Sequence, residues 1–356
     1  MSKLFTPLRI RELELKNRIV VSPMCEYSAV DGHPQPWHMV HLGSRAVGGA
    51  ALVLTEATAV EAIGRISPAD TGIYSDAHVA SWRPIVDFIR GQGATPGIQL
   101  AHAGRKGSTS KPWLGGKKIS LEDGGWEPVA PSAIAFDKEY PLPRALTLKE
   151  IQAVIAAFGK AAERALEAGF EVAEIHGAHG YLLHEFLSPF SNKREDEYGG
   201  DFENRIRLAT QVANTVRGAW PARWPLFFRV SATDWKDGGW DLEQTVELSR
   251  RLKALGVDLI DASSGGVIPG VPIPVGAGYQ VPFAEAIRRQ AGIATGAVGM
   301  ITDAEQAETV LSTGQADVVI LARELLRDPY WPRRAAHDLG EKIKPPVQYE
   351  RAWQTS

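Results

Sequence analysis

The chain contains a single cysteine, Cys25, among its 356 residues, so no disulfide can form within it. It has no apolar run near the roughly 20 residues that a membrane-spanning helix needs, and residues 1–7 lack the apolar core of a secretory signal peptide. The formal net charge is −3 and the basic residues are scattered, which argues against binding to nucleic acid or to anionic lipid. We therefore expect a cytoplasmic protein that binds neither membranes nor nucleic acids.

The two commonest glycine-rich nucleotide motifs are also missing. Neither G-x-G-x-x-G nor the Walker sequence G-x-x-x-x-G-K-[ST] occurs in the chain. A Rossmann dinucleotide site and a P-loop are therefore not supported.

Eight apolar, β-branched runs are present, and most of them are followed by a segment with helical periodicity. Strands that alternate with helices favour parallel βα units, and eight such units predict a single (β/α)₈ barrel of the TIM type. No linker or change of composition marks a second domain, so we expect one domain over residues 1–356. The runs are Asn17–Pro23, Ala50–Glu56, Thr95–Leu100, Phe170–His176, Leu226–Ser231, Val257–Ala262, Ala294–Val298 and Ala316–Leu321.

Three helix starts are indicated by side chains that can cap a helix. Thr147, Asp241 and Thr302 are predicted N-caps. Glu150 and Glu305 follow the two threonines at the spacing of a capping box.

Three segments do not fit the repeat. Residues 4–15 predict a hairpin that plugs the bottom of the barrel. Residues 102–144, after the third strand, form too long a connection for an ordinary βα loop, and such loops are often binding elements. The tail, residues 342–356, contains prolines and aromatic side chains and is expected to dock on its own barrel or on a neighbouring subunit.

Polar side chains close three of the predicted strands: Gln99, His176 and Arg229. Because parallel barrel strands end at one mouth, where active sites of this fold lie, these groups are expected to converge. An amide such as Gln99 suits the alternating donors and acceptors of a pyrimidine-type ring. The fixed charge of Arg229 suits an anionic ring such as a reduced flavin.

A phosphate site is predicted after the last two strands. Gly296–Gly299 allows close approach of the backbone, and Arg323 would supply the charge. Arg323 could instead be a surface arginine at a helix start. A phosphate site without the two motifs above indicates FMN or a sugar phosphate. An aldolase or isomerase that acts on a sugar phosphate would need catalytic carboxylates or a Schiff-base lysine, and no lysine ends a predicted strand.

The sharpest local motif is His176-Gly177-Ala178-His179-Gly180-Tyr181. Two histidines at this spacing can bind zinc or be structural, but no third ligand is evident, so no metal is expected. The alternative is that His176 and His179 both donate to one substrate oxygen, with Tyr181 as a proton source. Cys25 and Tyr27 follow the first strand, and Cys25, without a paired base, is expected to modulate a redox ring rather than to attack a substrate.

These residues resemble the old yellow enzyme family, and most closely its thermophilic-like subclass of FMN-dependent ene-reductases, which contains bacterial NADPH dehydrogenase and xenobiotic reductase. The resemblance spans essentially the whole chain. It is carried by Ser22-Pro23-Met24-Cys25-Glu26-Tyr27, by the run from His176 to Asn192, and by Arg323-Glu324-Leu325-Leu326-Arg327-Asp328-Pro329.

The resemblance implies roles for individual residues. Ser22, Pro23, Met24 and Cys25 would line the flavin, Ala57, Gln99 and Arg229 would contact its ring system, and Gly299, Ala322 and Arg323 would hold its phosphate. His176 and His179 match the pair that binds the substrate oxygen, Tyr27 matches a second hydrogen-bonding phenol, and Tyr181 matches the proton donor. Arg351 matches an arginine that reaches into a neighbouring subunit's site, which implies a homodimer or homotetramer. Relatives often have Gly at position 322, but Ala there needs only an ordinary φ.

The implied reaction is ping-pong. NADPH or NADH reduces tightly bound FMN and leaves, and an activated alkene then receives hydride from flavin N5 and a proton from Tyr181. The expected substrates are α,β-unsaturated carbonyl and nitro compounds. Two rivals are an aldolase or isomerase and a flavin-binding sensor in which Cys25 reports redox state.

Overall fold

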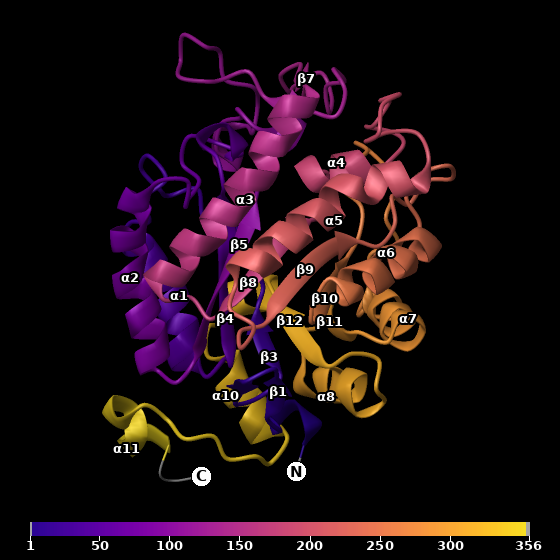
Figure 1. Cartoon of the computed structure of the whole chain (residues 1–356). Coiled ribbons are helices and arrows are strands. Elements are labelled where there is room, and N and C mark those ends of the chain that lie inside the picture. The colour runs from indigo at the N-terminus through magenta and orange to yellow at the C-terminus, as the bar shows by residue number, and fades with distance from the viewer. Residues whose placement is uncertain (1, 354–356) are drawn as a thin grey trace.

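The computed structural model describes residues 2–353, and within them eight parallel strands close into a barrel, as the sequence predicts (Figure 1). The strands follow one another around the barrel in chain order, and the last pairs with the first. They are β3 (Ile19–Val21), β4 (Leu52–Ala59), β5 (Thr95–Ala101), β8 (Val172–Gly177), β9 (Leu226–Ser231), β10 (Leu259–Ser263), β11 (Ala294–Val298) and β12 (Val318–Leu321).

The alternation of side chains along each strand builds two separate cores. On β8, Ala173 and Ile175 pack in the outer core with the helices, whereas Val172 packs in an inner core inside the barrel. The surrounding helices are α1 (Pro36–Gly48), α2 (Asp76–Gly91), α3 (Leu148–Ala168), α5 (Phe202–Ala219), α6 (Leu242–Ala254), α7 (Val281–Ala291) and α8 (Ala304–Ser312). Both faces of every barrel strand are therefore buried, which is why the strands read as nearly continuous apolar runs.

Two of the three predicted helix caps are confirmed and one is wrong. Thr147 forms the expected capping box with Glu150, and the Asp241 carboxylate accepts from the N–H of Gln244. At α8 the N-cap is Asp303, not Thr302, and Asp303 Oδ1 accepts from the N–H of Gln306 at 2.7 Å. Two capping residues stand side by side there, and the carboxylate makes the stronger charge-assisted bond.

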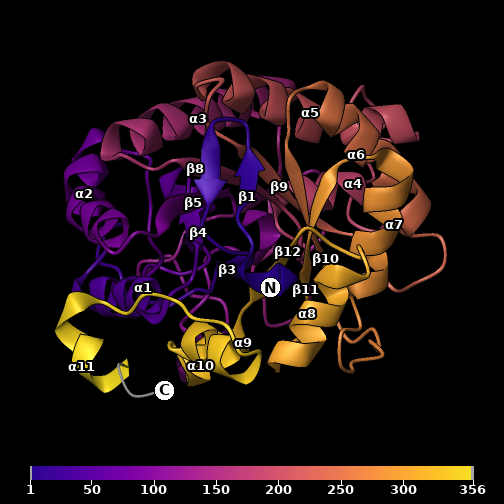
Figure 2. The same ribbon diagram turned by 90° about the horizontal axis from the view of Figure 1, so that it is seen from below.

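The predicted hairpin is present and lies on the underside of the barrel (Figure 2). Strand β1 (Leu8–Ile10) pairs antiparallel with β2 (Leu13–Leu15). Its side chains Ile10, Leu13 and Leu15 join the inner core of the barrel. The hairpin therefore keeps water from the lower end of the barrel interior.

The long connection after β5 lies at the opposite end, the mouth, where the barrel strands end (Figure 1). It contains the short helices η3 (Gly104–Lys106) and η4 (Pro112–Leu114), and two short strands, β6 (Val129–Ala130) and β7 (Arg144–Ala145), which pair with each other. This connection covers one side of the mouth, because several of its residues line a cavity together with Tyr27 and Tyr181. They are Lys106, Thr109, Ser110, Pro112, Gly115, Gly116, Lys117, Glu139 and Tyr140.

The tail runs under the lower end of the barrel. After α9 (Arg323–Arg327) and α10 (Trp331–Asp338), it forms η5 (Val347–Tyr349) and α11 (Glu350–Trp353). Residues 342–348 border a cavity of about 650 Å³ against the underside, and residues 354–356 of the predicted tail lie outside the described range. In residues 2–353 no helix has the length and hydropathy that crossing a bilayer requires.

Candidate active site

The predicted convergence of Gln99, His176 and Arg229 at the mouth is found. In the register of the barrel, His176 lies opposite Arg229, and Gln99 lies opposite both Ala57 on β4 and Glu174 on β8. All three predicted side chains are at least 95% buried. His176 and Arg229 face inward, because they lie four and two residues beyond the inner-core residues Val172 and Phe227. Gln99 faces inward as well, because it lies two residues beyond Gly97, where an added Cβ would meet inner-core side chains of β4.

One side of the mouth is a cavity of about 250 Å³ at the carboxyl ends of β11 and β12. Arg229, Gly299, Ala322 and Arg323 all line it, so the structure brings these four predicted residues together. Gly299 has φ of +122°, a conformation that L side chains rarely adopt, and an added Cβ would meet the ring of Tyr279 at 2.9 Å. The φ of Ala322 is −106°, so the expectation of an ordinary φ there is confirmed.

The segment after β3 lies against this group. Ser22 is buried, and its Oγ accepts a hydrogen bond from Arg229 Nη1 at 3.3 Å. Pro23, Met24 and Cys25 follow and are half-buried. Burial is the main reason that the pKa of Cys25 is raised well above its ordinary value, and the carboxylates of Asp70 and Glu56 raise it further. The side chain therefore stays a thiol, which fits a neighbour of a redox ring and disfavours a nucleophile.

His176 is presented as a hydrogen-bond donor. Its Nδ1 accepts from the N–H of Ala178 at 3.3 Å, which places the proton of the neutral ring on Nε2. Burial lowers the pKa of His176 well below its ordinary value, and the nearby Arg229 lowers it further. The ring is therefore neutral at physiological pH, with one N–H available for a ligand.

His179 lies beside it, with the two ring centroids 5.1 Å apart at 85°. Burial also lowers the pKa of His179 well below its ordinary value. Its Nε2, however, is 2.7 Å from Ser263 Oγ. His179 can therefore donate to a substrate only through Nδ1, in the tautomer where the Ser263 hydroxyl donates to Nε2. No sequence pattern indicates this dependence of His179 on Ser263.

Tyr181 completes the cluster. Its ring is 5.1 Å from that of His176, and it lines a cavity of about 390 Å³ on which Tyr27 also opens. Burial raises the pKa of Tyr181 well above its ordinary value. The pKa of the Tyr27 phenol is also raised, chiefly by burial. Tyr27 and His179 both have positive φ, at 46° and 60°, and such backbone strain is concentrated at functional sites.

Lys106 is a member of this site that the sequence reasoning missed. Its ammonium donates to the carbonyl oxygens of His179 and Gly266 and lies 5.6 Å from the ring centre of Tyr181. Burial lowers its pKa to about 7, and Arg105 contributes to the shift. The statement that no lysine ends a strand holds for the sequence, but it does not exclude a lysine from the mouth. Lys106 reaches the mouth from η3, five residues after β5 ends.

Two inward-facing carboxyls were missed for a similar reason. Glu174 on β8 and Asp261 on β10 are both fully buried one step below the mouth. Gln99 Nε2 donates to Glu174 Oε1 at 2.8 Å, and Asp261 Oδ2 lies 3.1 Å from Arg229 Nε. Neither carboxyl ends its strand, so neither belongs to the ring of strand-end groups at the mouth. These two lie among the apolar residues of ordinary strands, and only the two-residue alternation could have indicated that they face inward.

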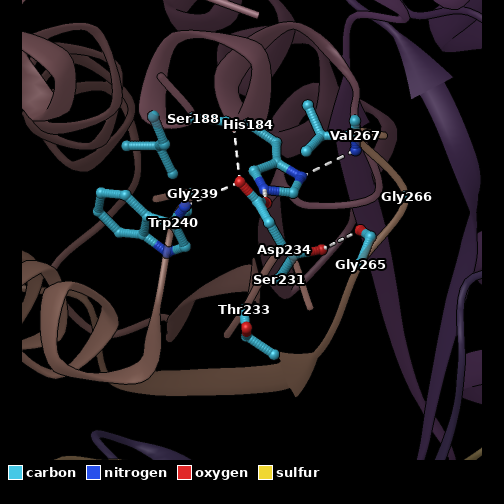
Figure 3. A network of polar contacts seen from close by, with 12 residues as sticks. His184, Ser188, Ser231, Thr233, Asp234, Gly239, Trp240, Gly265, Gly266 and Val267 are labelled. Carbon is cyan, nitrogen blue, oxygen red and sulfur yellow. Dashed lines mark hydrogen bonds and ion pairs between the residues drawn. The ribbon is translucent and has the colours of Figure 1, made fainter. Parts of the chain in front are cut away.

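A buried polar network fixes the loop that carries the cluster. His184 Nδ1 accepts from the N–H of Gly180, so its Nε2–H donates to Asp234 Oδ1 at 3.0 Å. Figure 3 shows Asp234 between His184, Ser188 and Trp240. Burial alone would raise the pKa of Asp234, but the hydrogen bonds from His184, Ser188 and Trp240 outweigh it and lower the pKa. Asp234 is therefore ionised, and the loop from His179 to Tyr181 is held in place.

Arg351 does not reach the mouth of its own chain. It lies on α11 at the lower end of the barrel and is exposed (Figure 1). If Arg351 acts at an active site, the site belongs to another copy of the chain.

The groups at the mouth fit a flavin mononucleotide. Arg323 and the backbone around Gly299 and Ala322 border a cavity suited to a phosphate. Because Gln99 Nε2 is used by Glu174, the amide presents its oxygen as an acceptor. Arg229 supplies a cation beside it. Among residues 2–353, no group of three or more His, Cys, Asp or Glu side chains is arranged to hold a metal ion.

Comparisons with known proteins agree on one family. Residues 3–342 match the NADH:flavin oxidoreductase / NADH oxidase family. An NADPH dehydrogenase of Geobacillus sp. (strain WCH70) is 52% identical over 352 residues, which cover 98% of each chain. That of Bacillus licheniformis is 52% identical over 353 residues, 99% of each chain.

Solved structures are also similar. Morphinone reductase superposes with a TM-score of 0.80 at 27% identity and covers 98% of this chain and 92% of its own. The old yellow enzyme homologue of Zymomonas mobilis superposes with a TM-score of 0.78 at 29% identity, over 97% of this chain and 95% of its own.

Proposed function

The chain belongs to the NADH:flavin oxidoreductase / NADH oxidase family, and from that membership we propose that it reduces the activated C=C bond of α,β-unsaturated carbonyl or nitro compounds. It is an FMN-dependent NADPH dehydrogenase of the old yellow enzyme family. The observation that carries the proposal is the cluster of His176, His179 and Tyr181 beside a cavity, with the N–H of neutral His176 available to a ligand.

When bound, FMN would supply the hydride chemistry between NADPH or NADH and the β-carbon of the alkene. Ser22, Pro23, Met24, Cys25 and Ala57 would line it, and Gln99 and Arg229 would contact its ring system. Gly299, Ala322 and Arg323 would hold its phosphate.

In this proposal His176 donates through Nε2 to the carbonyl or nitro oxygen of the substrate, and His179 donates through Nδ1 when Ser263 donates to its other nitrogen. These donors stabilise the negative charge that develops on that oxygen. Tyr181 keeps its proton because burial raises its pKa, and it delivers the proton to the α-carbon. Tyr27, which opens on the same cavity, contributes a second phenol for substrate binding.

The assembly is part of the proposal. Arg351, exposed at the lower end of the barrel, would enter the site of a neighbouring subunit in a homodimer or homotetramer. A cytoplasmic location is likewise proposed.

One spectroscopic experiment tests the chemistry. The purified protein should be yellow with flavin absorbance, NADPH should bleach it without oxygen, and cyclohexenone should restore the colour. A colourless protein would favour an aldolase or isomerase acting with Lys106 and the buried carboxyls. Bleaching without reoxidation by any activated alkene would favour a flavin-binding sensor that uses Cys25.

A further inference from the structure

Two carboxyl groups and one guanidinium lie close to one another's strands in the barrel interior below the mouth. Glu174 on β8 and Asp261 on β10 are both fully buried, and Arg229 on β9 lies between their strands. Arg229 is 5% exposed, and its Nε lies 3.1 Å from Asp261 Oδ2. Two carboxyls therefore share the neighbourhood of one guanidinium.

The hydrogen bonds around the two acids are incomplete. Glu174 Oε1 accepts from Gln99, but Glu174 Oε2 and both oxygens of Asp261 accept no hydrogen bond from any residue of the described chain. A second ionised carboxylate in this interior would be neither paired nor solvated, at a cost of several kcal/mol. Because both carboxyls are buried and one guanidinium serves both, the favoured state of the pair contains one proton.

We propose that Glu174 carries this proton and is a positioning residue for the flavin site. Its neutral carboxyl holds the Gln99 amide with its nitrogen down and its oxygen toward the mouth, and it leaves Asp261 as the single counterion of Arg229. The inference rests on the proposed function only in that FMN occupies the mouth. The role would make Glu174 a determinant of how strongly the ring system is bound.

The electrostatics agree with the geometry. Burial raises the pKa of Glu174 to about 8, the nearby Asp261 adds to the shift, and Arg229 opposes it. Burial also raises the pKa of Asp261, but Arg229 lowers it by direct pairing. The proton therefore belongs on Glu174 at neutral pH.

A pH dependence follows from what faces Glu174. Gln99 faces it from β5, Arg229 from β9 and Asp261 from β10, while His176 on its own strand is neutral. When Glu174 ionises above about pH 8, a second negative charge offsets the charge of Arg229. Binding of FMN, and of its reduced anion above all, should then weaken.

The test uses two isosteric variants of the holoenzyme. Glu174→Gln keeps an acceptor for Gln99 and cannot ionise. Glu185→Gln is the matched control, because Glu185 is equally buried and burial raises its pKa to about 8, but its carboxyl accepts from the Arg105 N–H in the loop outside the barrel. Infrared titration of the protonated carboxyl band from pH 6 to 10 and FMN dissociation constants over the same range are measured.

The wild type should show two protonated-carboxyl contributions that titrate near pH 8, and each variant should lose one of them. We therefore expect Glu185→Gln to keep the contribution of Glu174, and Glu174→Gln to keep only that of Glu185. The FMN dissociation constants of the wild type and of Glu185→Gln should rise roughly 3- to 10-fold between pH 7 and 9, whereas that of Glu174→Gln should not change. Titration of Lys106 near pH 7 affects all three proteins equally and is subtracted as their shared change. Glu174 ionised at pH 6, or an unchanged pH dependence in Glu174→Gln, would overturn the proposal.

A third variant separates positioning from charge. Glu174→Leu removes the acceptor of Gln99, so a folded variant should bind FMN at least roughly 10-fold more weakly than Glu174→Gln. Equal binding by the two would overturn the positioning role. If Glu174→Leu does not fold, Glu174→Ala provides the same comparison, because it also removes the acceptor of Gln99 and adds no bulk. All of these measurements need FMN binding but no alkene, so they remain interpretable if the proposed substrate class is wrong.

Discussion

The lower and upper halves of the barrel interior are built by the same strands and yet differ completely in chemistry. Two-residue steps along three strands lead from apolar to polar side chains: Val172 to Glu174 to His176, Phe227 to Arg229 to Ser231, and Leu259 to Asp261 to Ser263. The lower half packs with the hairpin as an apolar plug. The upper half buries charges with incomplete hydrogen bonds. The comparison indicates that the lower half stabilises the fold and that the upper half is retained for the site.

The largest expected effect is a loss of stability after a substitution in the lower half. Phe227→Ala should lower the free energy of unfolding by about 3–5 kcal/mol, because a fully buried ring is replaced by a cavity. Denaturant titration measures this. The matched control is Phe88→Ala on α2, where the ring is 39% exposed, which should cost less than about 1 kcal/mol. Similar losses for both variants would contradict the assignment of the inner core.

A substitution in the upper half should have the opposite result, because the variant should lose catalytic activity and keep its fold. His176→Ala should slow flavin reoxidation by the alkene by about 10²–10³-fold, since one donor to the developing oxyanion is lost. Stopped-flow absorbance under anaerobic conditions measures this half-reaction, and FMN should remain bound. His337→Ala, at an exposed site on α10, is the control and should change neither half-reaction. A variant defective in reduction by NADPH but not in reoxidation would refute the role of His176.

The upper half of the barrel interior should contribute a pH dependence of stability that the apolar lower half does not. The pKa of Glu174 is about 8 in the folded state and about 4.5 when unperturbed, so its stabilising contribution is complete below about pH 4.5 and is lost as the pH rises to about 8. Wild type should therefore lose stability relative to Glu174→Gln over this range, by on the order of 1–3 kcal/mol. Denaturant titrations at several pH values measure the difference. For Phe227→Ala, the difference in the free energy of unfolding from wild type should be the same at every pH. A difference for Glu174→Gln that does not change with pH would contradict the proposed contrast between the two halves.

The smallest effect concerns the far end of the molecule. Arg351→Ala should raise the KM for the alkene roughly 10-fold, equivalent to about 1–2 kcal/mol, if the guanidinium contributes binding at the rim of a neighbour's pocket. Steady-state kinetics and light scattering are the measurements, and Ala352→Ser, the next residue on α11, is the control. A monomer with unaltered kinetics would remove the shared site.

The sequence determined the barrel and most of the ring of groups at its mouth. Its eight strand runs, the hairpin and the caps at Thr147 and Asp241 follow from local periodicity and capping chemistry, which short stretches of chain contain in full. Gln99, His176 and Arg229 were predicted to meet because parallel strands of one barrel must end together. The predicted N-cap of α8, Thr302, was wrong, because Asp303 caps the helix. Both adjacent residues can cap a helix, and only the backbone conformation decides between them.

The tertiary structure alone decided which further side chains join that ring. Lys106 comes from a loop, Ser263 controls the tautomer of His179, and Glu174 and Asp261 face inward from runs that read as ordinary buried strands. Neither the direction in which a loop folds nor the direction in which a strand side chain points is contained in residue type. Both depend on long-range packing, because a shift of one residue in a strand exchanges its inner and outer faces.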